Sequence, residues 1–99
     1  MGDILNEYGS KMARIGQDGV VYNTTGVKLG RVSDNGDVYN NDGNKIGSYE
    51  GNGYVYEGTR RIGKVAADGR VYDYENDFIG STRGDHIQSG GAALLLLVR

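Results

Sequence analysis

Apolar and polar residues alternate in short groups along most of the chain, and glycine-containing turns separate these groups. A pattern of glycine, a variable residue, Val or Ile, and then Tyr or Leu recurs with spacings of 17, 17, 17 and 16 residues. The five copies begin at Gly2, Gly19, Gly36, Gly53 and Gly69. Seven or eight residues after the aliphatic position comes a second apolar residue followed by a small one: Met12-Ala13, Leu29-Gly30, Ile46-Gly47, Ile62-Gly63 and Ile79-Gly80. Each unit therefore predicts two short β-strands.

The junctions between units carry Asx-Gly dipeptides, namely Asp18-Gly19, Asn35-Gly36, Asn52-Gly53 and Asp68-Gly69. Such dipeptides favour a two-residue type I′ hairpin turn, because both central residues of that turn need positive φ. A turn centred on each dipeptide predicts four apolar cross-strand pairs: Ile15 with Tyr22, Val32 with Tyr39, Tyr49 with Tyr56, and Val65 with Tyr72.

Within the units, the turn residues predict three-residue loops that end in a left-handed residue: Glu7-Tyr8-Gly9, Thr24-Thr25-Gly26, Asn41-Asp42-Gly43 and Tyr74-Glu75-Asn76. The unit that begins at Gly53 is one residue shorter, and its Gly58-Thr59 pair fits a two-residue type II′ turn. These loops predict five further cross-strand pairs: Ile4 with Met12, Val21 with Leu29, Val38 with Ile46, Val55 with Ile62, and Val71 with Ile79.

Strand alternation divides each unit into an aliphatic face and a tyrosine face. Val38 and Ile46 fall on one face, which we assign to the core, and Tyr39 and Gly47 fall on the other. On the second face the tyrosine ring is expected to lie across the bare backbone of the neighbouring glycine, which explains a glycine inside a strand.

These elements predict an all-β domain over residues 1–99, with units starting near residues 2, 19, 36, 53 and 69 and a closing segment at 85–99. An open meander would leave two edges exposed to aggregation, so we expect radial closure, as in a propeller. The 18 glycines disfavour helices. The apolar run Ala92 to Val98 is shorter than the about 20 residues of a membrane span, so we predict a buried strand there.

The recurring Gly-x-Val-Tyr and Ile-Gly pattern, followed by the tail from Gly90 to Val98, resembles the bacterial β-flower repeat domains. The resemblance covers nearly the whole chain and rests on structural motifs. It implies short hairpins arranged as petals around a pseudo-symmetry axis. The family is described as four-fold, whereas five units are present here, and it brings no catalytic residues to this chain.

Charge and composition argue against several classes of function. The 11 basic and 13 acidic residues are spread along the chain, so no basic stripe suited to nucleic acid is present. Without cysteine there is no thiolate nucleophile and no cysteine-based zinc site. The segment from Met1 to Gly9 is acidic where a secretion signal would be basic and then apolar, which favours a cytoplasmic location.

The sequence offers no catalytic or metal constellation, and we predict neither an enzyme nor a cofactor. His86 is the single histidine and occupies a valine position of the repeat, so we interpret it as a surface or strand residue. The turn carboxylates match no calcium-loop pattern and are what Asx-Gly turns require. A hydrolase that uses Asp73, Glu75 and Asp77 is disfavoured, because nothing apolar nearby would raise a carboxyl pKa.

Two functional hypotheses remain. The first is a non-catalytic structural or protein-interaction module, which presents its loops to a protein partner or joins copies of itself; Tyr8 and Tyr74, at loop positions, are its candidate contact residues. The alternative is binding of a sugar or an aromatic metabolite, either in an axial opening or through the repeated tyrosines Tyr22, Tyr39, Tyr56 and Tyr72. Packing between neighbouring units also accounts for these four tyrosines.

Overall fold

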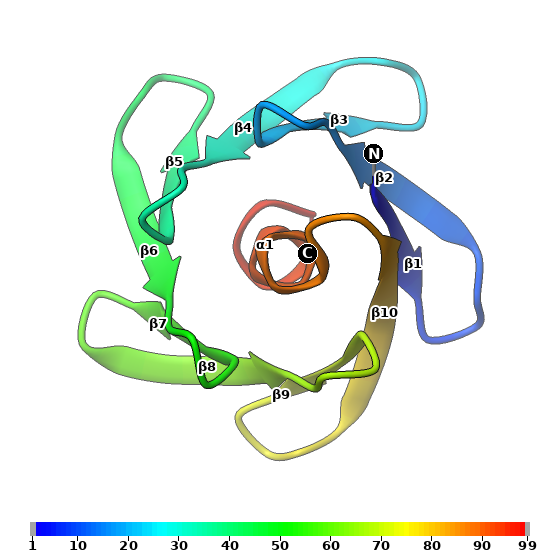
Figure 1. The fold of residues 1–99 in the computed structure, drawn as a ribbon, viewed down its shortest axis with the longest axis vertical. Coiled ribbons are helices and arrows are strands. Elements are labelled where there is room, and N and C mark those ends of the chain that lie inside the picture. Colours follow the sequence, from blue (N-terminus) through cyan, green and yellow to red (C-terminus); the bar gives the residue numbers. More distant parts are fainter. Residues whose placement is uncertain (1, 99) are drawn as a thin grey trace.

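The computed structural model describes residues 2–98 and shows a closed antiparallel barrel with a helix along its axis (Figure 1). The ten strands form five consecutive hairpin units. Their bounds are β1 Gly2–Asn6 and β2 Lys11–Ile15 in unit 1, β3 Val20–Asn23 and β4 Lys28–Val32 in unit 2, β5 Asp37–Asn40 and β6 Lys45–Tyr49 in unit 3, β7 Tyr54–Glu57 and β8 Arg60–Val65 in unit 4, and β9 Arg70–Asp73 and β10 Phe78–Gly84 in unit 5.

The last strand closes the barrel against the first. β10 pairs with β1 in antiparallel register, with Ile4 opposite Thr82 and Asn6 opposite Gly80. The remaining strands pair in sequence order, so the barrel is a meander whose two edges have been joined. The predicted all-β, radially closed repeat is therefore confirmed, with five hairpins around the axis (Figure 1).

The aliphatic position of each unit faces the barrel interior. These five side chains are fully buried, each with 0% exposure: Ile4, Val21, Val38, Val55 and Val71. The neighbouring tyrosines point the other way and are only half-buried, as strand alternation requires. The assignment of the aliphatic face to the core is thus confirmed.

The predicted register at the four junctions between units is wrong by one residue. Tyr22 lies opposite Arg14, and Ile15 lies opposite Val21; the other three junctions show the same shift. The turn has three residues rather than two, since the Gly16 N–H donates to the Val20 carbonyl. Gly19 alone takes positive φ, so the aspartate keeps an ordinary backbone and the loop is the three-residue type.

The predicted loops within the units are confirmed. The third residue is left-handed in each three-residue loop, including Asn76 with φ of 67°, and Gly58 opens the shorter turn with φ of 65°. The residue before each three-residue loop adds a cap that the sequence analysis missed. Its side-chain Oδ1 accepts two backbone N–H groups of the loop, as Asn23 does from Thr25 and Val27 at 3.0 and 2.9 Å. The equivalent residues are Asn6, Asn40 and Asp73.

The predicted pairing inside each unit is also wrong, because every hairpin contains a β-bulge. Val38 lies opposite Gly47 and Tyr39 lies opposite Lys45, so Ile46 is the extra residue. The bulged residues in the five units are Met12, Leu29, Ile46, Ile62 and Ile79. The small residue therefore lies on the same inner face as the valine, not beneath the tyrosine.

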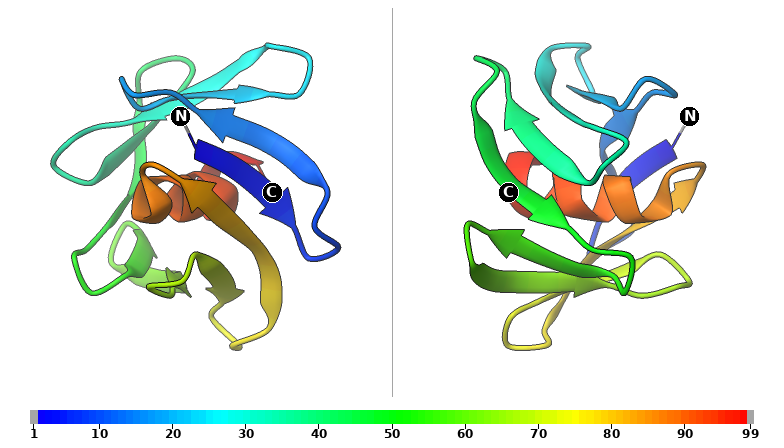
Figure 2. Two further views of the ribbon diagram at one scale, coloured as in Figure 1. Left: turned by 45° about the vertical axis from the view of Figure 1, so that its right-hand side comes forward. Right: turned by 60° about the vertical axis from the view of Figure 1, so that its left-hand side comes forward.

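The C-terminal segment is helical, which corrects the prediction of a buried strand over residues 92–98. Helix α1 spans Ile87–Ala93 and continues as the π-helix η1 over Leu94–Val98. Gly90, Gly91, Ala92 and Ala93 are all buried, because this helix fills the barrel (Figure 2). From Gly90 to Val98 the helix is apolar on all sides, which suits a position enclosed by strands, where packing outweighs the low helix propensity of glycine.

The small residues of units 5, 4, 3 and 2 make room for the four leucines of the helix, one leucine to each of these units. A Cβ placed on Gly80 would lie 2.8 Å from Leu94, and one on Gly47 would lie 2.6 Å from Leu96. Leu95 and Leu97 meet Gly63 and Gly30 in the same way. Consecutive helix residues thus face consecutive units. An α-helix rotates ~100° per residue, whereas neighbouring units lie only one fifth of a full turn apart around the barrel axis. The π-helix, with its i→i+5 hydrogen bonds, is wider and rotates less per residue, so it matches the spacing of the units better.

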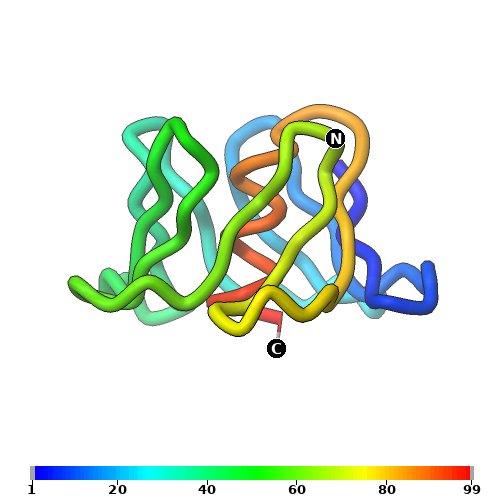
Figure 3. Tube along the Cα trace, turned by 90° about the horizontal axis from the view of Figure 1, so that it is seen from below, coloured from blue at the N-terminus to red at the C-terminus, as the bar shows by residue number. Residues whose placement is uncertain are grey.

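The two ends of the barrel differ. The four turns between units and the start of α1 lie at one end, which we call the turn end (Figure 3). The five loops within units and the C-terminal end of η1 lie at the opposite end, which we call the loop end (Figure 3). Near the turn end the helix is fixed by hydrogen bonds from the Gln88 side chain to the Gly51 carbonyl, at 3.0 Å, and between the Tyr49 and Ser89 hydroxyls, at 2.9 Å. Within residues 2–98, no helix is long and apolar enough to cross a membrane.

An ion-pair cluster lies across the closing seam. Asp3 on β1 contacts Lys11 on β2 at 3.2 Å and Arg83 on β10 at 3.4 Å. The hydrogen bond from Lys11, supported by Arg83 and partly offset by desolvation, lowers the pKa of Asp3 from its ordinary value of 3.8. The Asp3 carboxylate thus links the first and last units electrostatically.

Replacement of Asp3 is expected to give a pH-dependent loss of stability. A carboxyl whose pKa is lower in the folded chain stabilises the fold at pH values above its unfolded pKa, and this contribution disappears as the pH falls through the folded pKa. Asp3→Asn should therefore lower the melting temperature at neutral pH, and the difference from the wild type should close in strongly acidic buffer. Circular dichroism melts over this pH range measure it, with Asp34→Asn, at an exposed turn position, as the control. An equal difference at every pH would contradict the role of the ion pair.

Candidate functional site

The four repeated tyrosines lie on the outside of the barrel, each at a junction between units. Each is opposite a residue of the preceding unit, in the pairs Arg14 with Tyr22, Arg31 with Tyr39, Ser48 with Tyr56, and Lys64 with Tyr72. Three of the four partners are basic. The prediction that the rings cover glycine backbone is wrong, because the glycines face inward and meet the helix.

Cations lie over the rings of Tyr22, Tyr39 and Tyr72. The guanidinium carbon of Arg31 lies 4.4 Å from the ring centroid of Tyr39, and the ammonium of Lys64 lies 5.5 Å from that of Tyr72. Arg14 lies over Tyr22 at 5.7 Å. Such stacking stabilises neighbouring units by about 0.5–1 kcal/mol per exposed pair. Packing between units accounts for these rings, and they sit in separate units without converging on one cavity.

The axial opening, which the ligand-binding hypothesis also names, is filled by α1 and η1. Ala92 and Ala93 have 0% exposure, and Leu94 is also buried. A ligand would therefore have to bind at an outer groove rather than on the axis. Ligand binding by the tyrosine face stays a prediction.

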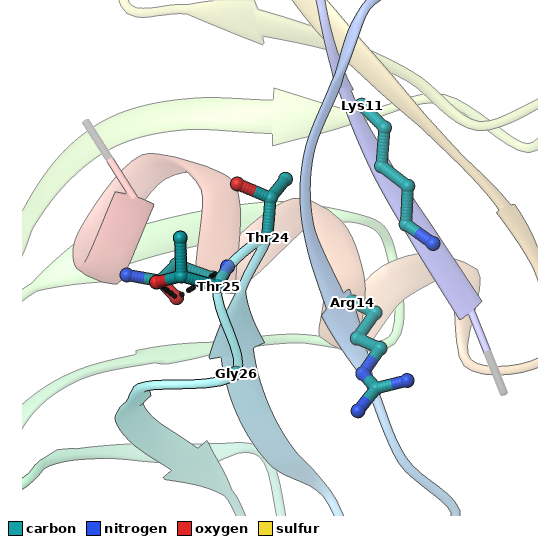
Figure 4. A pocket seen from close by; sticks show the side chains of 6 residues that line it. Lys11, Arg14, Thr24, Thr25 and Gly26 are labelled. Atoms are coloured by element: carbon teal, nitrogen blue, oxygen red, sulfur yellow. Dashed lines mark hydrogen bonds between the residues drawn. The ribbon is translucent and has the colours of Figure 1, made fainter.

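One outer groove lies between units 1 and 2 and is shown in Figure 4. It has a volume of ≈ 340 Å³ and is lined by Lys11, Arg14, Asn23, Thr24, Thr25 and Gly26. Lys11 and Arg14 project from β2, while the threonines belong to the loop that Asn23 caps (Figure 4). Lys11 already binds Asp3, and the side chains of Arg14 and the threonines offer hydrogen-bond donors to a polar ligand.

Large apolar side chains gather at the loop end. Tyr8 is 86% exposed and Tyr74 is 53% exposed, and both belong to loops within units. Met12 and Phe78 follow these two loops, Val27 follows the loop of unit 2, and all three are exposed as well. The two loop tyrosines that the sequence predicts as contact residues are therefore accessible.

The bulged residues extend this surface to the axis. Leu29, Ile46, Ile62 and Ile79 are half-buried and pack against the core, as do Leu95, Leu96, Leu97 and Val98 of η1. We call these eight residues, together with Met12, the loop-end apolar surface. Sequence reasoning missed it because it assigned residues 92–98 to a buried strand and placed the bulged residues in the core.

Two grooves show how this surface is built. In one, Leu95 and Ile62 lie beside Tyr74 and the polar residues Glu57, Arg60 and Asp73, in a volume of ≈ 280 Å³. In the other, Leu94, Val98, Met12 and Ile79 lie beside Asn6 and Glu7, in a volume of ≈ 220 Å³. Both combine helix and bulge side chains with a polar margin, an arrangement typical of protein interfaces.

The polar groups near this surface are already engaged in structure. The Asp73 carboxylate accepts the N–H groups of Glu75 and Asp77 at 2.9 and 3.0 Å. The Glu75 carboxylate raises the pKa of Tyr74, while partial burial and then Glu50 raise that of Tyr56, so both phenols stay protonated at neutral pH. His86 is exposed, with φ of 61° just before α1. Within residues 2–98, no three carboxylate or histidine side chains gather as a metal site would require.

The fold and this surface define a class of protein: a closed barrel of five β-hairpins around an apolar axial helix whose end is partly exposed. Comparison with known proteins found no matching family model, and no curated protein or solved structure that matches.

Proposed function

We propose that this chain is a non-catalytic interaction module that binds a protein partner through its loop end. The observation that carries the proposal is the loop-end apolar surface, which continues from the bulged residues onto the half-buried side chains at the end of η1. Contiguous apolar surface that is bordered by polar residues is typical of protein-binding sites. Tyr8 and Tyr74 on the surrounding loops add aromatic side chains of the kind enriched in interfaces.

The construction of the loops supports binding. Four of the five loops are held by a side-chain cap that accepts two backbone N–H groups, as at Asn40 with Asp42 and Asn44. Loops that are already ordered lose little conformational entropy when they bind, so more of the contact energy appears as affinity. The Asp73 carboxylate, which already accepts two N–H groups of its loop, also favours binding over catalysis.

Site-specific photocrosslinking tests this function. A photoreactive amino acid at Tyr8 or Tyr74 is expected to give a covalent product in cells of the source organism, because both positions border the apolar surface. The same group at Gln17 or Asp34, exposed in turns at the opposite end, is the matched control and should give little product. Mass spectrometry of the purified product identifies the partner. Equal labelling from both ends, or none from the loop end, would contradict the proposal.

A further inference from the structure

We infer that the partner of the loop end is a second copy of this chain, so that two barrels meet face to face about a two-fold axis perpendicular to the barrel axis. This inference rests on the proposed binding function of the loop end. Three observations carry it: the distribution of charge around the loops, the position of oppositely charged units across the ring, and the size of the face.

The charges on the loops are not evenly distributed. The loop of unit 5 carries three carboxylates, Asp73, Glu75 and Asp77, and no basic residue. The loop of unit 2 ends in Lys28 and has no acidic residue, while the loop of unit 3 ends in Lys45 and also contains Asp42. Both lysines are exposed, and Lys45 remains 55% exposed while bound to Asp37. The loop of unit 4 carries Arg60 and Arg61 with Glu57, and the loop of unit 1 carries Glu7 and Lys11. The loop end is therefore most acidic over unit 5, while the exposed Lys28 and Lys45 lie over units 2 and 3.

These regions lie on opposite sides of the ring. Unit 5 is next to units 4 and 1, so units 2 and 3 are across the axis from it (Figure 1). A two-fold axis in the plane of the face, perpendicular to the line that runs from unit 5 to units 2 and 3, brings unit 5 of one copy onto units 2 and 3 of the other. The acidic loop of each copy then meets the lysines of its partner, and the pairing occurs twice, as a self-complementary interface requires.

The size of the face fits a dimer. The barrel measures 30 × 29 Å across and 20 Å along its short axis. A disc of that width has an area of roughly 700 Å², close to the about 800 Å² that each partner buries in a standard interface. The centre of the disc holds Leu95, Leu96 and Leu97, and the charges lie at its margin, as in protein interfaces generally. One apolar surface would thus cover the other.

Charge reversal tests the dimer. Sedimentation equilibrium of the full chain is expected to show a concentration-dependent dimer. The double variants Lys28→Glu with Lys45→Glu, and Glu75→Lys with Asp77→Lys, should each weaken dimerisation by at least about tenfold, because each substitution acts twice in a symmetric dimer. All four positions are exposed, and Lys45→Glu removes a surface ion pair with Asp37 of the kind that contributes about 0–1 kcal/mol, so circular dichroism melts should stay cooperative and within a few degrees of wild type. The matched control is Asp34→Lys with Asp68→Lys at the turn end, which should leave the dimer intact.

Mixing the two double variants gives a sharper test. In the mixed dimer, the glutamates introduced at positions 28 and 45 of one variant face the lysines introduced at positions 75 and 77 of the other. The unchanged acidic loop of the first variant faces the unchanged lysines of the second, so both contacts are attractive again. We expect a heterodimer in native mass spectrometry from the mixture, although each variant alone is largely monomeric. Failure of the mixture to associate would overturn the face-to-face arrangement.

Sedimentation and crosslinking together separate this inference from the proposed function. A wild-type chain that stays monomeric at several hundred micromolar overturns the dimer. If the loop-end crosslinks then identify a different protein, the interaction function stands and only the identity of the partner is wrong. If the loop end gives no crosslink at all, both ideas fail. A crosslinked product with twice the mass of the chain supports both.

Discussion

A chain that ends at Asp85, and so lacks the axial helix, is expected to lose its cooperative unfolding transition. Ala92, Ala93 and Leu94 are buried against the inner valines, and the half-buried leucines of η1 fill the space left by the glycines. Burial of a Leu-sized side chain stabilises a protein by about 1.5–3 kcal/mol. Loss of several such side chains removes an amount comparable to the total stability of a small domain, about 5–15 kcal/mol.

Thermal melts followed by circular dichroism measure this effect, together with binding of a hydrophobic dye to the opened interior. The full chain with Val98→Ser is the control, because this half-buried residue lies at the end of the helix. That variant should keep a cooperative melt at a modestly lower temperature. A truncated chain that melts cooperatively at the wild-type temperature would show that the ten strands form a stable barrel without the helix.

The sequence predicts the repeat and the core because a strand shows its faces at every second residue. The five aliphatic positions, such as Val38, follow that period, and all are buried. The loops within units are predictable for a similar reason, since a left-handed position accepts few residues. Glycine occupies three of these positions and asparagine a fourth, as Asn76 shows with its positive φ.

The register could not be read from the Asx-Gly dipeptides alone. The Asp18 Oδ1 accepts the Val20 N–H at 3.1 Å, which stabilises the aspartate in an ordinary conformation and leaves positive φ to Gly19 alone. The longer turn shifts each pairing by one residue, and Tyr22 meets Arg14 instead of Ile15. Both pairings are favourable, so local chemistry did not distinguish them.

The helix was missed because its composition gives conflicting signals. Gly90 and Gly91 are poor helix formers, while Ala92, Ala93 and the four leucines are good ones. A short apolar run without periodicity fits a buried strand or a buried helix equally well. The absence of β-branched residues between Gly90 and Leu97 was the available signal in favour of a helix.

The candidate site was only partly predictable from the sequence. Tyr8 and Tyr74 could be placed on loops, and the structure shows both exposed. The loop-end apolar surface depends on the bulges and on the helix, which bring residues such as Ile62 and Leu95 together from distant parts of the chain. Neither feature has a local sequence pattern of its own, so the surface emerges only from the tertiary structure.

Gly91→Ala is expected to destabilise the protein by about 1–3 kcal/mol, although alanine favours helices more than glycine does. A Cβ on Gly91 would overlap the side chain of Val65, which is 4% exposed and confined by its β-branched rotamer. The neighbouring Gly90 is the matched control. Its added Cβ would meet the buried Thr82 at 3.1 Å, a milder contact than the overlap with Val65, so Gly90→Ala should destabilise the protein less than Gly91→Ala does.

A double-mutant cycle isolates the packing contact. Val65→Ala makes room for the new methyl group, so the double variant should be less destabilised than the sum of the two single variants by about 0.5–3 kcal/mol. Urea unfolding of the four proteins gives the required free energies. If the two effects simply add, the loss at Gly91 does not arise from overlap with Val65, and the helix would have to lie further from unit 4 than the structure places it.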